Sequence, residues 1–158
     1  MKIDTTDAKI VRLFTEHPRM SVLEASRQLG VARATVQARL DKLIDGGAIS
    51  SLSPRLDPTK FGYSVSAFVS VRVEQGAGHA NLGEFLAGIP EVTEVHTVSG
   101  DFDVFCRVVA TSNADLQRVL DRIAAHPTPV RTSSSLVLTT HFENRALPAF
   151  EAAAEHPA

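Results

Sequence analysis

The hydrophobic periodicity of the chain changes near residue 62, and this change constrains the fold more than any other feature. Before it, apolar residues recur at three- and four-residue spacings, which is typical of amphipathic helices. From Tyr63 to Glu74 apolar and polar residues largely alternate, which indicates a β-strand. We therefore expect an α+β protein with a helical domain at 1–60 and a sheet-containing domain at 61–146. Residues 147–158 are expected to form a tail, as a short helix or a frayed end.

Three helices are predicted in the first domain. The first runs from about Asp4, a good N-cap residue, to residue 17. The second starts at Ser21, which forms a capping-box pattern with Glu24, and stops at Gly30. The third carries a buried stripe made of Val36, Leu40 and Leu43. Two short helices joined by a tight glycine-containing turn, with a supporting helix before them, form a helix-turn-helix at 21–43.

The third helix is the expected DNA-reading element, because an α-helix fits the major groove of B-DNA. Arg33 suits guanine, Gln37 suits adenine, and the other basic residues suit phosphates. The complete set of candidates is Arg27, Arg33, Ala34, Thr35, Gln37, Ala38, Arg39 and Lys42. The alternative is a three-helix bundle with a polar outer face that does not bind DNA.

The charge distribution favours the DNA-binding interpretation. Residues 1–60 carry ten Lys and Arg against seven Asp and Glu, whereas 61–158 carry six against eleven. A basic half joined to an acidic half suggests two domains with different partners.

The second domain reads as strand, helix, strand, strand, helix, strand. Gly76 and Gly78 are expected to end the first strand, and strands are expected at 92–99, 104–110 and 130–142, the second of these central. Two helical stripes lie 34 residues apart: Leu82, Phe85, Leu86 and Ile89, then Leu116, Val119, Leu120 and Ile123. This order with a pseudo-repeat predicts a ferredoxin-like βαββαβ fold.

Only one face of such a sheet is covered by its helices, so we expect a homodimer through the bare face. On the first strand that face carries serines, Phe68 and Arg72. On the last strand the sequence allows either of two alternating sets. They are Arg131, Ser133, Ser135 and Val137, or Thr132, Ser134, Leu136 and Leu138.

Other kinds of site are disfavoured by the residues present. The single cysteine, Cys106, excludes an intrachain disulfide and is expected to be a small core residue. The six histidines lack metal-ligand spacing, and no nucleotide-binding or hydrolase fingerprint occurs. No apolar run is long enough to cross a membrane and no signal peptide is evident. We expect a cytoplasmic protein without metal, cofactor or membrane partner.

Several motifs together resemble the Lrp/AsnC (feast/famine) family of prokaryotic transcription regulators. They are Asp4-x-x-Asp7, the 21–43 segment, Leu56-Asp57-Pro58-x-x-Phe61-Gly62, Val98-Ser99-Gly100-Asp101-Phe102-Asp103, residues 132–138, and Phe142-x-Asn144-Arg145. The resemblance covers about residues 3–146. It implies a winged helix-turn-helix domain and a RAM/ACT-like domain that senses an amino acid. It also implies dimers paired through the sheet, often assembled into octamers, with the effector between dimers.

The resemblance also implies the effector-binding residues. They are Val98, Ser99, Gly100, Asp101 and Asp103 in the turn, with Ser133, Ser134 and Ser135 on the last strand. Turn N–H groups can receive a carboxylate and an aspartate can accept from an α-ammonium. Strand alternation places Ser134 on the opposite face from the other two serines. Alternatively, the aspartates only hold the turn and the serines line a dimer interface.

Two residues depart from the family pattern. Ala32 replaces the usual Ser or Thr at the start of the recognition helix, and Leu52 stands where many members have an aromatic residue. The expected function is a DNA-binding transcriptional regulator that responds to an amino acid, and not an enzyme. Two alternatives are an enzyme resembling sirohaem decarboxylases, which the acidic second domain disfavours, and an architectural DNA-binding protein without an effector.

Overall fold

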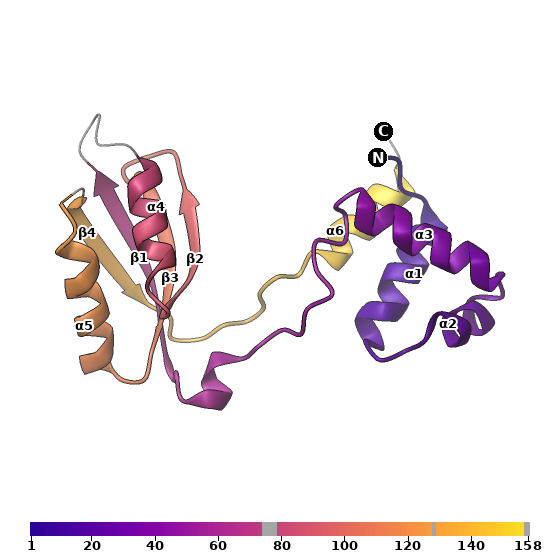
Figure 1. The fold of residues 1–158 in the computed structure, drawn as a ribbon, viewed down its shortest axis with the longest axis horizontal. Coiled ribbons are helices and arrows are strands. Elements are labelled where there is room, and N and C mark those ends of the chain that lie inside the picture. The colour runs from indigo at the N-terminus through magenta and orange to yellow at the C-terminus, as the bar shows by residue number, and fades with distance from the viewer. Residues whose placement is uncertain (74–78, 128, 157–158) are drawn as a thin grey trace. The chain divides into compact units, whose positions relative to one another are not determined.

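The computed structural model describes residues 1–73, 79–127 and 129–156. They form two compact units (Figure 1). Unit 1 contains Met1–Pro54 together with Phe142–Ala158, and unit 2 contains Arg55–His141. The glycines at 76 and 78, expected to end the first strand, lie outside the described residues, as does the end of the tail at 157–158.

Unit 1 is built from four helices among its described residues. They are α1 (Thr5–Glu16), α2 (Val22–Leu29), α3 (Arg33–Asp45) and α6 (Leu147–Glu155). The core of the first three consists of Ile10, Leu13, Ala25, Val36 and Leu40. Val22 and Leu29 of α2 are half-buried and pack against this core.

The ends of these helices follow from local chemistry, as the sequence predicts. Asp4 caps α1 in a capping box, and Ser21 caps α2 in another with Glu24. Gly30 ends α2 with φ +66, a left-handed conformation that favours glycine. Ala32 stands at the N-cap of α3 without a side-chain hydrogen bond, so α3 begins uncapped.

Residues 46–57, all of them described, follow α3 as turns, bends and irregular segments that contain no strand. A short 3-10 helix, η1 (Pro58–Phe61), comes next. The paired strands of a wing, which the family resemblance implies, are therefore not formed by this segment.

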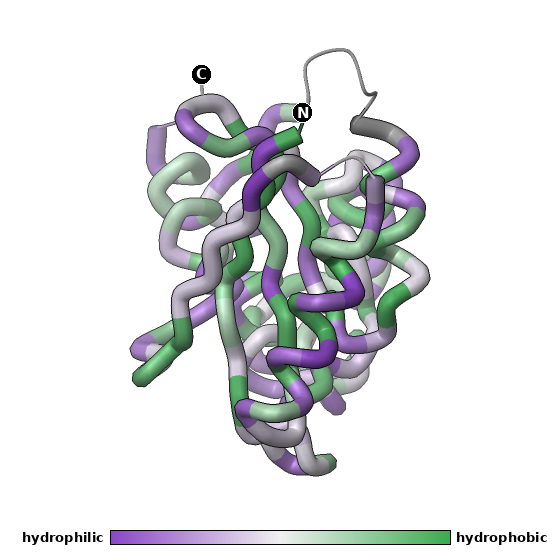
Figure 2. Tube along the Cα trace, turned by 90° about the vertical axis from the view of Figure 1, so that its left-hand side faces the viewer, coloured by the Kyte–Doolittle hydropathy of each residue, from purple (hydrophilic) through white to green (hydrophobic). Residues whose placement is uncertain are grey.

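Unit 2 has the predicted order of elements. They are β1 (Val65–Val73), α4 (His79–Ala87), β2 (Val92–Thr97), β3 (Val104–Ala110), α5 (Asn113–Ala124) and β4 (Pro129–Leu136). The sheet order is β2-β3-β1-β4 with every neighbouring pair antiparallel, so β3 is central as expected. Figure 2 shows hydrophobic and hydrophilic segments succeeding one another along these strands.

The helices α4 and α5 cover one face of the sheet and enclose the core of unit 2. This core joins alternate residues of β1 and β3 to both helical stripes predicted above. Its most deeply buried members include Val69, Val71, Leu82, Leu86, Ile89, Cys106, Val108, Val119 and Ile123.

The other face carries Phe68 of β1, which stacks on Phe105 of β3 with ring centroids 5.1 Å apart. Ser133 pairs with Ser70 and Ser135 pairs with Phe68, so these two serines lie on this open face. Ser134 pairs with Val69 and lies on the helix-covered side. Of the two sets left open by the sequence, the one containing Arg131, Ser133 and Ser135 faces outward on the open side.

The last strand is shorter than predicted. The sequence suggested a strand over 130–142, but β4 ends at Leu136. Leu136 pairs with Ala67, and the N–H of Val137 donates to the carbonyl of Ser66 at 2.8 Å. Val65, the first residue of β1, lies only one position beyond Ser66, so the pairing stops close to the end of β1 itself.

Candidate DNA-binding and effector sites

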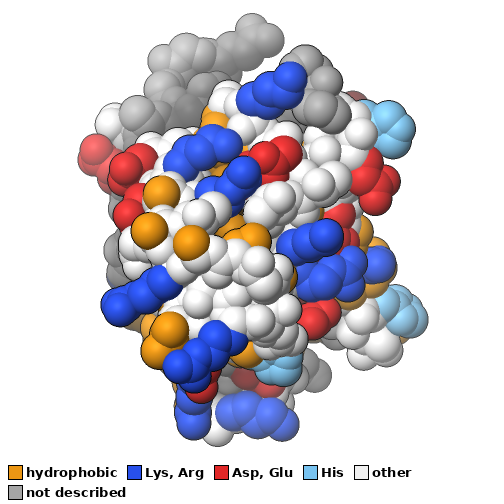
Figure 3. Space-filling view, turned by 90° about the vertical axis from the view of Figure 1, so that its right-hand side faces the viewer, with side chains coloured by type: hydrophobic (Ala, Val, Ile, Leu, Met, Phe, Trp, Pro, Cys, Tyr) orange, Lys and Arg blue, Asp and Glu red, His pale blue; other side chains and the backbone are white. Residues whose placement is uncertain are grey.

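Helix α3 is held by its apolar face and presents its other face to solvent. Val36 and Leu43 are fully buried and Leu40 is nearly so. Residues on its other sides are exposed, among them Arg33, Ala34, Thr35, Gln37, Ala38 and Lys42. Figure 3, which looks onto unit 1, shows Lys and Arg side chains spread over the surface with Asp and Glu among them.

Two of the candidate arginines, Arg33 and Arg27, form no ion pair within the part of the chain that the structure describes. Neither Arg33 nor Arg27 of α2 has an ion-pair partner within 4.0 Å among the described residues. Gln37 Nε2 donates to Asp41 Oδ1 at 2.8 Å, an i,i+4 contact that must open before the amide can read a base.

Arg39 and Lys42 contact the start of α1. Arg39 Nη1 lies 2.8 Å from both carboxylate oxygens of Asp4 and 2.7 Å from Asp7 Oδ1. Lys42 Nζ lies 3.2 Å from Asp7 Oδ2 and 2.8 Å from the carbonyl oxygen of Lys2. The Arg39 guanidinium, together with backbone N–H groups, holds the pKa of Asp4 below its usual value.

The carboxylate of Asp7 explains why these cations are needed. Asp7 is fully buried, and a buried charge requires a partner of opposite charge. Arg39 and Lys42 supply that charge from α3, so the network joins the N-terminus of α1 to the middle of α3. The sequence motif Asp4-x-x-Asp7 signalled this pair of carboxylates, but sequence reasoning assigned both cations to DNA phosphates.

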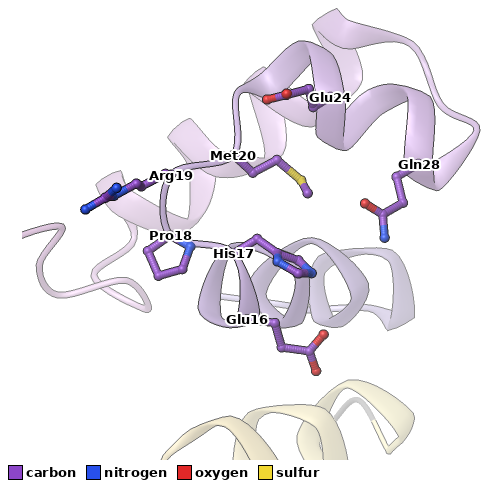
Figure 4. Close-up of a pocket in the computed structure, with 7 residues that line it drawn as sticks. All are labelled: Glu16, His17, Pro18, Arg19, Met20, Glu24 and Gln28. Carbon is purple, nitrogen blue, oxygen red and sulfur yellow. The ribbon is translucent and has the colours of Figure 1, made fainter.

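An open depression of about 670 Å³ lies between the end of α1 and α2 (Figure 4). His17 and Met20 point into the space between these helices, toward Gln28. The lining residues are Glu16, His17, Pro18, Arg19, Met20, Glu24 and Gln28. The two carboxylates make it a poor site for a phosphate, and no sequence motif pointed to it.

In unit 2 the turn between β2 and β3 is held by Asp103. Its carboxylate accepts the Val73 N–H at 2.9 Å, and its own N–H donates to the Val71 carbonyl at 3.0 Å. The Val98 N–H donates to the Asp103 carbonyl at 2.9 Å. Asp103 therefore fixes the turn to the end of β1.

The rest of the turn is open to solvent. Val98, Ser99, Gly100 and Asp101 are exposed, and Gly100 has φ +128, where a side chain would be strained. Asp101 therefore presents an accessible carboxylate at this end of the sheet.

The serines of β4 lie away from the turn of their own chain. Strand β1 separates β3 from β4, so two interstrand spacings, about 10 Å in all, lie between them. One row across the sheet consists of Val104, Val71 and Thr132. The turn lies on one side of this row along the strands, and the three serines of β4 lie on the other side. The α-carboxylate and α-ammonium of one amino acid cannot bridge that separation.

No group of three or more His, Cys, Asp or Glu residues that could hold a metal ion occurs within residues 1–73, 79–127 and 129–156. Across those same ranges, no helix is long and apolar enough to span a membrane. Cys106 is buried in the core, and burial raises the pKa of its thiol to about 11.

A helix-turn-helix with an exposed third helix, followed by a half-covered ferredoxin-like sheet, defines a DNA-binding protein with a ligand-binding domain. The profile of the AsnC-type helix-turn-helix domain matches residues 3–44, and that of the Lrp/AsnC ligand binding domain matches residues 66–147. The chain belongs to the Lrp/AsnC family of transcriptional regulators, as the sequence motifs indicated.

Individual relatives agree with this assignment. The HTH-type transcriptional regulator FL11 of Pyrococcus horikoshii is 32% identical over 146 residues, which are 92% of this chain and 96% of that protein. The structure of E. coli AsnC has a TM-score of 0.84 at 24% identity and covers 92% of this chain and 99% of its own. A Neisseria meningitidis regulator solved with L-Met has a TM-score of 0.79 at 24% identity and covers 89% and 93%. The named relatives are transcriptional regulators, so the chain is a regulator and not an enzyme.

Proposed function

We propose that this chain binds a specific duplex DNA sequence in the cytoplasm as a homodimer, and that an amino acid or similar small effector changes its DNA affinity. The observation that carries the DNA part is the exposed N-terminal half of α3, a helix whose opposite face is buried through Val36, Leu40 and Leu43. Arg33 at its first turn has the reach and the charge to contact a guanine edge.

The proposed DNA contacts are narrower than the sequence alone suggested. Phosphate contact is proposed for Arg27, and base contact for exposed residues of α3. The latter are Arg33, Ala34, Thr35, Gln37 and Ala38. Arg39 and Lys42, which are engaged by Asp7 of α1, are proposed to orient α3 instead.

The open face of unit 2 supports the homodimer. An aromatic stack of Phe68 on Phe105, with Arg107 over the Phe68 ring at 5.9 Å, gives this face an apolar centre with polar surroundings. A second copy of the same sheet would cover it, and assembly of dimers into an octamer is the further expectation. Sedimentation of the purified chain would test both, since a monomer at micromolar concentration would refute the sheet-paired dimer.

The effector site is proposed to be shared between copies. Ser134 lies on the opposite side of the sheet from Ser133 and Ser135, so it stays outside a dimer formed through the open face. We propose that it meets the Ser99–Asp101 turn of another copy around one effector, while Ser133 and Ser135 line the dimer interface. The solved complex of the Neisseria neighbour with L-Met is consistent with a ligand of this class, although that likeness shows only the fold.

The DNA proposal is tested by selecting a duplex from a random pool and measuring its affinity by fluorescence anisotropy. Arg33→Ala should weaken binding to the selected duplex and relax base preference, at a cost of about 1–3 kcal/mol for a lost bidentate contact. Arg122→Ala, which removes an exposed arginine from α5, is the matched control and should leave binding unchanged. Equal affinity in all three proteins would refute the assignment of α3.

The effector proposal is tested by titrating each of the twenty amino acids while following thermal unfolding. A ligand at 100 times its Kd should stabilise the folded protein by about 2.7 kcal/mol. Ser134→Ala should weaken the response, whereas Ser53→Ala, an exposed serine outside both candidate sites, should not. A chain that binds DNA but responds to none of the amino acids would favour an architectural role.

A further inference from the structure

Helix α6 is formed by residues that lie almost entirely beyond the matched ligand-binding domain, which ends at residue 147. Pro148 sits in its first turn, where proline is tolerated, and alanines fill much of the rest. A helix of only nine residues is marginal by itself in water, so it needs packing partners. Its stability must therefore come from the surface on which it lies.

That surface is α1 of the DNA-binding unit. Leu147, Phe150 and Glu151 are half-buried and Ala154 is 3% exposed, and these positions share one face of α6. Figure 1 shows α6 beside α1, and the contacts between these helices belong to unit 1.

A bidentate ion pair joins the two helices. Arg12 Nε donates to Glu151 Oε1 at 2.6 Å, and Arg12 Nη2 donates to Glu151 Oε2 at 2.7 Å. This fork geometry fixes orientation better than a single charge contact does. Arg12 Nη1 also lies 3.6 Å from Glu16 Oε1 on its own helix, so the guanidinium contacts carboxylates of both helices.

Docking of α6 on α1 determines how many chain segments connect the two units. Unit 2 starts at Arg55 and ends at His141, and unit 1 holds the segments on both sides of it. With α6 docked, two chain segments connect the units, one after α3 and one after β4. With α6 released, only the first connection would remain.

We propose that α6 anchors the second connection, and that Glu151 is a positioning residue which limits where the recognition helix can lie relative to the ligand-binding domain. The inference rests on the proposed dimer and its DNA binding. In a dimer, two recognition helices must reach two half-sites about one DNA turn apart. A two-point attachment narrows the volume that each helix explores, which raises the effective concentration of the second helix at its half-site.

The test compares two duplexes, one with both half-sites and one with a single half-site. Glu151→Ala and deletion of residues 147–158 should each weaken binding to the two-half-site duplex by about tenfold, because effective concentration falls. Binding to the single half-site should stay unchanged. Glu155→Ala, which removes an exposed carboxylate from the same helix, is the matched control.

Two further measurements separate this role from general support of the fold. The double change Arg12→Glu with Glu151→Arg should restore most of the two-half-site affinity. Hydrogen exchange of the α6 amides, measured without DNA, should show protection in the unmodified chain and its loss in Glu151→Ala.

The other possible results of these experiments would each refute a different part of the proposal for α6. Equal weakening on both duplexes would show that α6 only supports the fold of unit 1, and no weakening on either would show that the second connection is unimportant for binding. Unprotected α6 amides in the unmodified chain would refute docking. Failure of the unmodified chain to bind any DNA would refute the proposed function, which is distinguishable from these results.

Discussion

Replacement of Arg39 by alanine separates the two roles that a basic residue on α3 can have. If Arg39 orients α3, its loss leaves the fully buried carboxylate of Asp7 with Lys42 Nζ, at 3.2 Å, as its remaining cation. Removing one partner of a buried ion pair costs about 3–5 kcal/mol. Because the Arg39 side chain is 29% exposed and Lys42 remains, we expect a smaller loss of about 2 kcal/mol in the stability of unit 1.

The assay must report on unit 1 alone, because two units need not unfold together. Hydrogen exchange of the α1 and α3 amides does this, and 2 kcal/mol corresponds to roughly 30-fold faster exchange where global opening of the unit controls it. Arg33→Ala, an exposed change on the same helix, is the control and should alter stability by less than about 0.5 kcal/mol.

The salt dependence of DNA affinity supplies the second readout. A phosphate contact contributes about 0.9 to the slope of log K against log salt. Arg39→Ala should therefore lower affinity without changing this slope. If the slope fell by about that amount per lost contact while amide exchange stayed at its original rate, Arg39 would be a phosphate ligand and the positioning argument would be wrong.

Three further predictions follow from single features of the structure. Ala32→Ser supplies the missing cap of α3, because the N-cap residue already has an extended backbone. It should slow amide exchange in α3 by the equivalent of about 1 kcal/mol. Ala34→Ser is the control, and unchanged amide exchange in Ala32→Ser would contradict the capping argument. The Arg118 guanidinium donates to the carboxylate of Glu91 and holds the pKa of Glu91 below its ordinary value of 4.5. The stability that this pair adds to unit 2 is therefore complete above pH 4.5 and is lost as the pH falls through the lowered pKa. Urea unfolding of unit 2 between pH 3 and 6, a range chosen around that ordinary pKa, should show a weaker pH dependence in Glu91→Gln, and an unchanged profile would count against the pair. Burial raises the pKa of Cys106 to about 11, so a thiol reagent at pH 8 should label it only in denaturant, and rapid labelling of the folded chain would contradict its place in the core.

The helices and their ends could be predicted because the interactions that form them are local. A cap such as Ser21 with Glu24 joins residues three apart, and the stripe of Val36, Leu40 and Leu43 follows the period of one helix. The order of strands and helices in unit 2 was predictable for the same reason, since the alternation along β1 and the 34-residue offset of the helical stripes are properties of short segments.

The sites were less predictable, because their side chains meet partners that are distant in sequence. Arg39 and Asp7 are 32 residues apart, and the sequence shows only that Arg39 is basic and lies on the DNA-reading helix. Asp103 and Val73 are 30 residues apart, so the hydrogen bond by which Asp103 holds the turn could be found only from the fold.

By itself, then, the sequence determined the α+β class, the helix-turn-helix, the βαββαβ order and the family. Only the tertiary structure decided which serines of β4 face the open side, where β4 ends, and that α6 docks on α1 through Arg12 and Glu151. The physical reason is the range of the interactions. Backbone hydrogen bonds in helices, caps and alternation act over a few residues, whereas strand register and ion pairs such as Arg12 with Glu151 join residues up to 139 positions apart.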